Sequence, residues 1–237
     1  MELLHPAAKF LEQRRFEKFA RSLIRLPQGD ETSWDYLLPE ARWQEIISGL
    51  KDPETWFMGL SQATGVYFFP SREWPPRLLR YLRRLGVGRV LEGGAGRGHL
   101  TAALAPLAAA AGLDFLAVDR GDGEFQAGLP VCPLVQPGDV FQVIGEFQPA
   151  AVIYAWPPPG QSLAPLFNTP SLRYLLLIGE EAGGAAGAPE DWERLPHKIS
   201  PWLGCFSRGR TGPERHRVTI FFREARQGFR SKERRKD

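Results

Sequence analysis

The chain is poor in the residues that build disulfide frameworks and metal centres. It has two cysteines and four histidines in 237 residues. Cys132 and Cys205 lie far apart and form no CxxC pair, and the histidines show no metal-ligand spacing. This pattern excludes a disulfide framework and a zinc cluster, so we expect no metal and a reducing cytoplasm as the location.

Long apolar runs are also missing. No stretch approaches the roughly 18 uncharged apolar residues that a membrane helix needs. The longest candidate, residues 100–113, is rich in alanine and contains Pro106. The N-terminus has Glu2 and no apolar region of a signal peptide. We therefore expect neither a secretory signal nor a membrane partner.

The composition, 43% apolar and 24% charged, is that of an ordinary globular protein. The length fits one large domain, or one domain with an N-terminal extension. The net charge of +3 is unevenly distributed. From Gly204 on, 11 basic residues face 4 acidic ones, a net of +7, which leaves −4 for the preceding part. The basic character therefore belongs to the C-terminal end.

Short apolar runs alternate with helical patterns after Gly86, which predicts an α/β domain with a mostly parallel sheet. The two last strands, around "WLGCFSRG" and "RHRVTIFFR", resemble an antiparallel hairpin at a sheet edge. The expected strands are 88–92, 113–118, about 131–135, 150–155, 172–178, about 199–206 and 216–223, with helices over 98–111 and about 139–146.

The chain divides into three parts by its patterns. Residues 1–74 begin with helical periodicity and are expected to form an N-terminal helical cap, in which Asp52-Pro53 signals a helix start. Residues 75–225 are expected to form the α/β domain. Residues 226–237, "RQGFRSKERRKD", are basic, lack apolar periodicity and are expected to be a disordered tail.

A glycine-rich turn, "VLEGGAGRG" at 90–98, follows the first predicted strand of this domain. Glycine permits a tight turn and a close approach of ligand atoms, and ligands of open α/β sheets bind at such strand ends. A dinucleotide fingerprint would need glycine at 99, where His99 stands, and no Gly-Lys-Ser/Thr of a P-loop follows. The pattern Glu-x-Gly-x-Gly-x-Gly resembles motif I of class I S-adenosylmethionine-dependent methyltransferases.

The resemblance covers about residues 86–223 and implies a doubly wound, mostly parallel seven-stranded sheet with an antiparallel edge hairpin. It also implies S-adenosylmethionine as the cofactor. The cofactor-binding residues that it implies are Glu92, Gly94, Gly96 and Gly98 of the glycine turn, Asp119 and Asp139.

Two acids follow later strands. Asp119 ends the apolar run "LDFLAVD", 21 residues after Gly98, where a carboxylate accepts hydrogen bonds from ribose hydroxyls in nucleotide-binding folds. Asp139, in "QPGDVFQ", follows the third strand, where the family often keeps an acid or amide for the adenine amino group. Its alternative role is the N-cap of the next helix.

"AVIYAWPPPG" at 151–160 runs from the fourth strand into the place of the family's catalytic loop. The amino-methylating branch has Asn/Asp-Pro-Pro-aromatic there. Pro157 and Pro158 match, but Trp156 replaces the polar residue and Pro159 replaces the aromatic one. The resemblance therefore implies Trp156, Pro157 and Pro158 as an active-site loop without an assigned base, in a poorly characterised branch with a WPP motif. A rigid strand exit is the alternative.

The resemblance predicts methyl transfer to an acceptor that the sequence does not identify. RNA, protein and small molecules remain open as acceptors. The basic C-terminal tail is a candidate RNA contact, because Lys and Arg neutralise phosphates. Aromatic residues from Tyr67 to Trp74 are candidates for lining a pocket. The second hypothesis is a binding or scaffold protein that keeps the fold and the cofactor site without catalysis.

Overall fold

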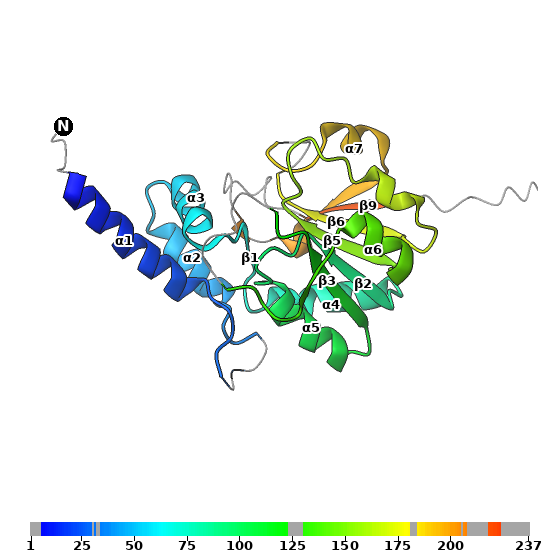
Figure 1. Ribbon diagram of the computed structural model, residues 1–237, viewed down its shortest axis with the longest axis horizontal. Helices are drawn as coiled ribbons and strands as arrows, with labels where there is room; N and C mark the ends of the chain where they lie inside the picture. Colours follow the sequence, from blue (N-terminus) through cyan, green and yellow to red (C-terminus); the bar gives the residue numbers. More distant parts are fainter. Residues whose placement is uncertain are drawn as a thin grey trace, which may run out of the picture.

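The computed structural model describes residues 6–29, 31, 34–122, 130–180, 184–204, 206–207 and 218–223. The predicted tail at 226–237 lies outside these residues, so its expected disorder and RNA contact stay predictions. No helix in the described part of the chain is long and apolar enough to cross a membrane. Figure 1 shows α1, α2 and α3 gathered beside the sheet, with the other helices around it.

Three helices form the N-terminal part, and their apolar sides share a small core. This core contains Trp43, Phe57 and Leu60, and the partly buried Phe206 of the C-terminal part packs against it. Asp52 caps α3 as predicted, because its side chain accepts a hydrogen bond from Thr55 N at 3.1 Å. The three helices are α1 (Pro6–Leu23), α2 (Glu40–Ser48) and α3 (Pro53–Thr64).

Seven strands of the described residues form the main sheet, in the order β4-β3-β2-β5-β6-β9-β7. β9 is antiparallel to both of its neighbours, and the other pairs are parallel. The strand order and directions therefore confirm the predicted doubly wound, mostly parallel sheet with an antiparallel pair of strands at its edge. The strands are β2 (Arg89–Gly93), β3 (Asp114–Asp119), β4 (Val135–Pro137), β5 (Ala151–Ala155), β6 (Tyr174–Ile178), β7 (His197–Ser200) and β9 (Val218–Phe222).

Helices cover both faces of the sheet. Alternate strand residues explain this: Ile153 packs with α4 (Trp74–Arg84) and α5 (Thr101–Ala110), whereas Val152 packs with α6 (Val140–Phe147). The second face is completed by the 3-10 helix η1 (Ala164–Asn168) and by α7 (Pro189–Arg194).

Two expected strands are wrong in their positions: the strand expected at about 131–135 lies at Val135–Pro137, and the one expected at about 199–206 starts earlier. This later strand lies at His197–Ser200, and Pro201 then starts the 3-10 helix η3 (Pro201–Leu203). Proline lacks the N–H that would continue the pairing, so the strand ends before it. Phe206–Ser207 forms a separate strand, β8, which pairs antiparallel with β1 (Phe68–Phe69). This small sheet connects the N-terminal part to the C-terminal part.

Candidate functional site

The glycine turn lies at the carboxyl end of β2, where the strand order reverses between β2's neighbours β3 and β5. Gly94 has φ of +61° and Gly98 has φ of +74°, a conformation that favours glycine. A Cβ at Gly94 would lie 2.3 Å from the Tyr154 ring, and one at Gly98 would lie 2.5 Å from Cβ of Cys132. A Cβ at Gly96 would meet nothing within 4 Å. Gly94 and Gly98 are thus required by packing as well, and Gly96 faces open space.

Asp119 connects this turn to the end of β3. Its Oδ2 accepts a hydrogen bond from Gly96 N at 2.7 Å, and its Oδ1 accepts one from Gly121 N at 2.7 Å. These two amides fix the carboxylate at the mouth of the pocket, where it is partly exposed. Each oxygen retains acceptor capacity for a ligand hydroxyl.

Asp139 combines the two roles that the sequence left open. Its Oδ1 accepts a hydrogen bond from Phe141 N at 2.8 Å, so it is the N-cap of α6. Its Oδ2 lies 3.7 Å from a guanidinium nitrogen of Arg120, and the residue lines the pocket. The capping role therefore leaves the second oxygen at the pocket.

Glu92 and Gly98 lie behind the pocket and do not line it. Glu92 is buried, and its carboxyl group accepts a hydrogen bond from Thr101 Oγ1 at 2.8 Å. Burial raises the pKa of Glu92 to about 8, and the nearby Asp119 charge also raises it. Glu92 is therefore mostly neutral at pH 7. Its hydrogen bond with Thr101 joins the end of β2 to the start of α5 on the inner side of the glycine turn.

The Trp-Pro segment, residues 156–159, follows β5 and lines the pocket on the other side of β2 from the ends of β3 and β4. Trp156 has φ of +53°, which is rare for a bulky residue. Its backbone N–H donates a hydrogen bond to the Ile178 carbonyl at 2.7 Å. The Pro157 carbonyl accepts from Gly187 N at 3.0 Å, and the Gly187 carbonyl accepts from Gly160 N at 2.7 Å. The loop is therefore held in one conformation by the segment before α7.

A buried carboxylate supports this loop from behind. Asp191 of α7 is 1% exposed. It accepts hydrogen bonds from Ser162 Oγ at 2.6 Å and from Leu163 N at 2.7 Å. Both donors lie two or more residues after the last proline of the segment, so Asp191 fixes the chain where it leaves the pocket.

The N-terminal part contributes Gly65 and Tyr67 to the pocket. The rings of Tyr67 and Trp156 have centroids 6.1 Å apart and planes tilted by 40°. Of the aromatic residues expected at the pocket, Tyr67 alone among the described ones lines it. The others, Phe68, Phe69 and Trp74, are buried in the two cores.

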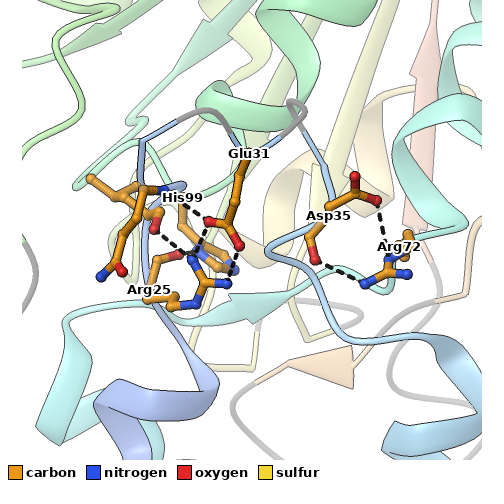
Figure 2. Close-up of polar contacts among 7 residues, drawn as sticks. Arg25, Glu31, Asp35, Arg72 and His99 are labelled. Carbon is orange, nitrogen blue, oxygen red and sulfur yellow. Dashed lines mark hydrogen bonds and ion pairs between the residues drawn. The ribbon is translucent and has the colours of Figure 1, made fainter.

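The segment between α1 and α2 fixes the N-terminal part to the start of α5, as Figure 2 shows. The Nδ1 atom of buried His99 lies 3.0 Å from the carbonyl oxygen of Arg25. Tyr36 OH donates a hydrogen bond to the His99 carbonyl. Arg25 pairs with both carboxylate oxygens of Glu31 at 2.5 Å. Arg72 pairs with Asp35 on the other side of the segment, and the Arg72 guanidinium donates to the Asp35 carbonyl at 2.8 Å. His99 is therefore structural.

The pocket has a volume of about 590 Å³ and two unlike sides. Its charged side carries Arg97, Asp119, Arg120, Asp122 and Asp139, whereas its other side is formed by the Trp-Pro segment, Tyr67, Gln161 and Ala185. On the latter side, no acid, histidine or lysine lines the pocket among the described residues. The pocket can therefore bind a polar ligand beside an apolar or aromatic one.

Sequence reasoning missed Arg97, Arg120 and Tyr154, which all line the pocket. Arg97 Nε is buried without a hydrogen-bond partner in the described part of the protein. Arg97 lies inside the glycine turn and Arg120 directly follows Asp119, so their position next to the motif was a usable signal. Tyr154 lacked one, because it reads as an ordinary strand residue.

No family model and no curated protein matches this chain. Solved structures of methyltransferases resemble it weakly. One is a putative caffeoyl-CoA O-methyltransferase from Staphylococcus aureus, with 8% identity, 77% of this chain and 98% of that chain covered, and a TM-score of 0.43. A methyltransferase from Geobacter sulfurreducens has 15% identity, coverages of 79% and 98%, and a TM-score of 0.43. Human N-acetylserotonin methyltransferase, in complex with SAM, has 10% identity, coverages of 90% and 67%, and a TM-score of 0.40.

Proposed function

We propose that the chain is an S-adenosylmethionine-dependent methyltransferase whose acceptor binds against the Trp-Pro segment. The observation that carries this proposal is the bond between Gly96 N and Asp119 at the point where the strand order reverses. This edge is where open α/β sheets bind nucleotide-like ligands. The partly exposed carboxylate and the bare backbone beside it fit a ribose.

The residues present fit the rest of the cofactor as well. The buried Arg97 Nε lacks a partner among the described residues, and a guanidinium is suited to a carboxylate such as that of the methionine moiety. A Cβ at Gly96 would meet no protein atom within 4 Å, so the space beside this glycine is free for a ligand. Asp119 would hold the ribose hydroxyls and Arg97 the carboxylate, while Asp139 offers its second oxygen to the adenine amino group.

The bound cofactor would supply an electrophilic methyl group on a sulfonium, a good leaving group. The chain itself needs to position the acceptor nucleophile in line and to exclude water. Trp156, Pro157 and Pro158 supply a rigid wall for that purpose. Because the described residues of this side offer no base, we expect an acceptor that reacts as a neutral nucleophile or that ionises without help.

Trp156 is central to the acceptor side. A tryptophan at positive φ costs of order 1–3 kcal/mol and persists only where the surroundings impose it. Asparagine and aspartate, which the amino-methylating branch has here, accept this conformation more readily. The strained tryptophan favours a role for its ring at the acceptor, in place of a polar group that binds a target amine.

The test is transfer of a labelled methyl group from S-adenosylmethionine to components of a cell extract. We expect labelled product with the full chain, none with Asp119→Ala, and unchanged transfer with Asp114→Ala, which alters an exposed acid at the start of the same strand. Binding of the cofactor without any labelled product would favour the second candidate, a scaffold protein without catalysis. The observation that favours a scaffold protein is that position 156 holds tryptophan and not a polar residue.

A further inference from the structure

The outer side of α4 carries an unusual concentration of positive charge. Its inner side buries Leu78, Leu79 and Leu82 in the core under the sheet. The outer side presents exposed arginines, with Arg80 and Arg84 one helical turn apart. Helix α4 lies on the opposite face of the sheet from α6, because the buried residues of the two helices belong to different cores. This surface is separate from the residues that line the pocket.

Two aromatic rings lie beside Arg84 and beside a second cation, Lys198 of β7. The rings of Tyr81 and Trp202 have centroids 6.2 Å apart. The guanidinium carbon of Arg84 lies 5.8 Å from the Trp202 ring centroid, and Lys198 Nζ lies 5.8 Å from the Tyr81 centroid. We call Arg80, Tyr81, Arg84, Lys198 and Trp202 the α4 platform.

The described part of the protein provides no acidic partner for the cations of the platform. Among the described residues, Arg80, Arg84 and Lys198 form no ion pair. Arg77, on the same helix, pairs with Glu40 at 2.9 Å. A solvated helix face usually intersperses both signs of charge, whereas α4 after Arg77 contains no acid. The unpaired charge favours an anionic partner.

Trp202 is exposed at a fixed position. The residue is 40% exposed, although large aromatic residues are usually buried. The short helix η3 that carries it is anchored, because Trp74 Nε1 donates to the Leu203 carbonyl at 2.9 Å in the core. An anchored, exposed ring loses little entropy when a flat group stacks on it.

From these contacts we infer that the α4 platform binds single-stranded nucleic acid. Single strands offer phosphates to cations and unpaired bases to aromatic rings, and cations and rings lie side by side on this surface. A duplex hides its base faces, and an anionic bilayer offers charge without flat rings. The inference concerns a surface outside the proposed cofactor site and does not depend on methyl transfer.

The experiment is fluorescence anisotropy of the full chain with labelled single strands of about 12 nucleotides, a length within the site sizes of such grooves. Parallel arms use RNA, DNA and the corresponding duplex, between about 50 and about 200 mM salt. Trp202→Ala should weaken binding by roughly 5- to 100-fold, and Trp202→Phe should retain most of it. Arg84→Gln should lower the slope of log affinity against log salt by about 0.7.

Arg42→Gln is the matched control, because Arg42 is an exposed arginine on α2 paired with Glu45. It should leave binding unchanged. Circular dichroism checks that Trp202→Ala folds. The double variant Arg80→Gln/Lys198→Gln removes two charges of the platform and leaves both rings in place, and it should also weaken binding. A deletion of 226–237 separates the contribution of the tail. A higher affinity for RNA or for DNA shows which kind of single strand the surface prefers, and either result supports the inference.

Three outcomes would overturn it. One is binding that does not change in Trp202→Ala and in the charge variants. Another is equal binding of duplex and single strands that is indifferent to Trp202. The third is capture by phosphatidylserine vesicles, sensitive to the same substitutions, without binding of the oligonucleotides.

Discussion

The two sides of the pocket are built in different ways. The glycine-turn side consists of backbone bent at Gly94 to Gly98 and of a carboxylate, Asp119, held by two amides. The Trp-Pro side consists of side chains and of a loop held from behind by Gly187 and Asp191. The first side presents charge to a ligand, and the second presents rings and proline. A cofactor site and an acceptor site would differ in this way, since the cofactor is constant and the acceptor is specific to the protein.

The largest effect is expected from Gly94→Ala. The new Cβ would meet the Tyr154 ring at 2.3 Å, in addition to the cost of a positive φ. Together these should lower the free energy of unfolding by roughly 2–5 kcal/mol. Gly96→Ala is the matched control, because it carries the φ cost of about 1–2 kcal/mol without the clash. If denaturant unfolding showed an equal loss of stability in Gly94→Ala and Gly96→Ala, the packing of Tyr154 on Gly94 would be contradicted.

Asp191→Ala tests the other side. It leaves Leu163 N and Ser162 Oγ without their acceptor in a part of the molecule that excludes water, so unfolding should become easier by about 2–4 kcal/mol. Glu193→Ala, an exposed acid of the same helix, should stay within about 0.5 kcal/mol. Binding of S-adenosylhomocysteine to the folded Asp191→Ala protein should be unchanged. A large loss of that binding would show that the two sides are coupled.

Stability against pH tests the buried acid behind the glycine turn. The folded-state pKa of Glu92 lies at about 8, above its unfolded value, so stability falls as pH rises up to that value. Burial lowers the pKa of His99 to about 4, so its contribution is lost as pH falls below its usual range. The two slopes oppose each other at acidic pH, and between about pH 6.5 and 8 only Glu92 of these two groups contributes a slope.

In that window we expect the free energy of unfolding to decrease by up to about 1.4 kcal/mol per pH unit. Glu92→Gln keeps an acceptor for Thr101 and should remove the decrease. A slope that persists in Glu92→Gln would assign the titration to another group.

Trp156→Asn should have the smallest effect on stability and a large one on activity. Asparagine accepts positive φ at a lower cost, and this offsets part of the packing that is lost with the Trp156 ring, so the variant should lose no more than about 1 kcal/mol of stability. Affinity for S-adenosylhomocysteine should stay the same, while methyl transfer should be lost. Thermal unfolding and the labelled-transfer assay measure the two effects. Retained transfer would show that the ring plays no part at the acceptor.

The sequence predicted the glycine turn and the position of Asp119 because both depend on local signals, namely glycine spacing and the end of an apolar run. It predicted the sheet for the same reason. Strand β7 was misplaced because Pro201, next to Ser200, ends the pairing, and the apolar residues after it belong to η3 and β8. Gly65 reaches the pocket from a segment that is distant in the sequence, a contact that no local pattern encodes.

The central claim is that Asp119 and the glycine turn bind S-adenosylmethionine, and calorimetry with S-adenosylmethionine and S-adenosylhomocysteine tests it most directly. We expect both to bind the wild type. Asp119→Ala should weaken binding by roughly 1.5–3 kcal/mol per charged hydrogen bond, which is tenfold or more. Asp114→Ala, at the exposed start of the same strand, should bind as the wild type does. No binding of either compound at millimolar concentration, or binding that is equal in wild type and Asp119→Ala, would contradict the claim.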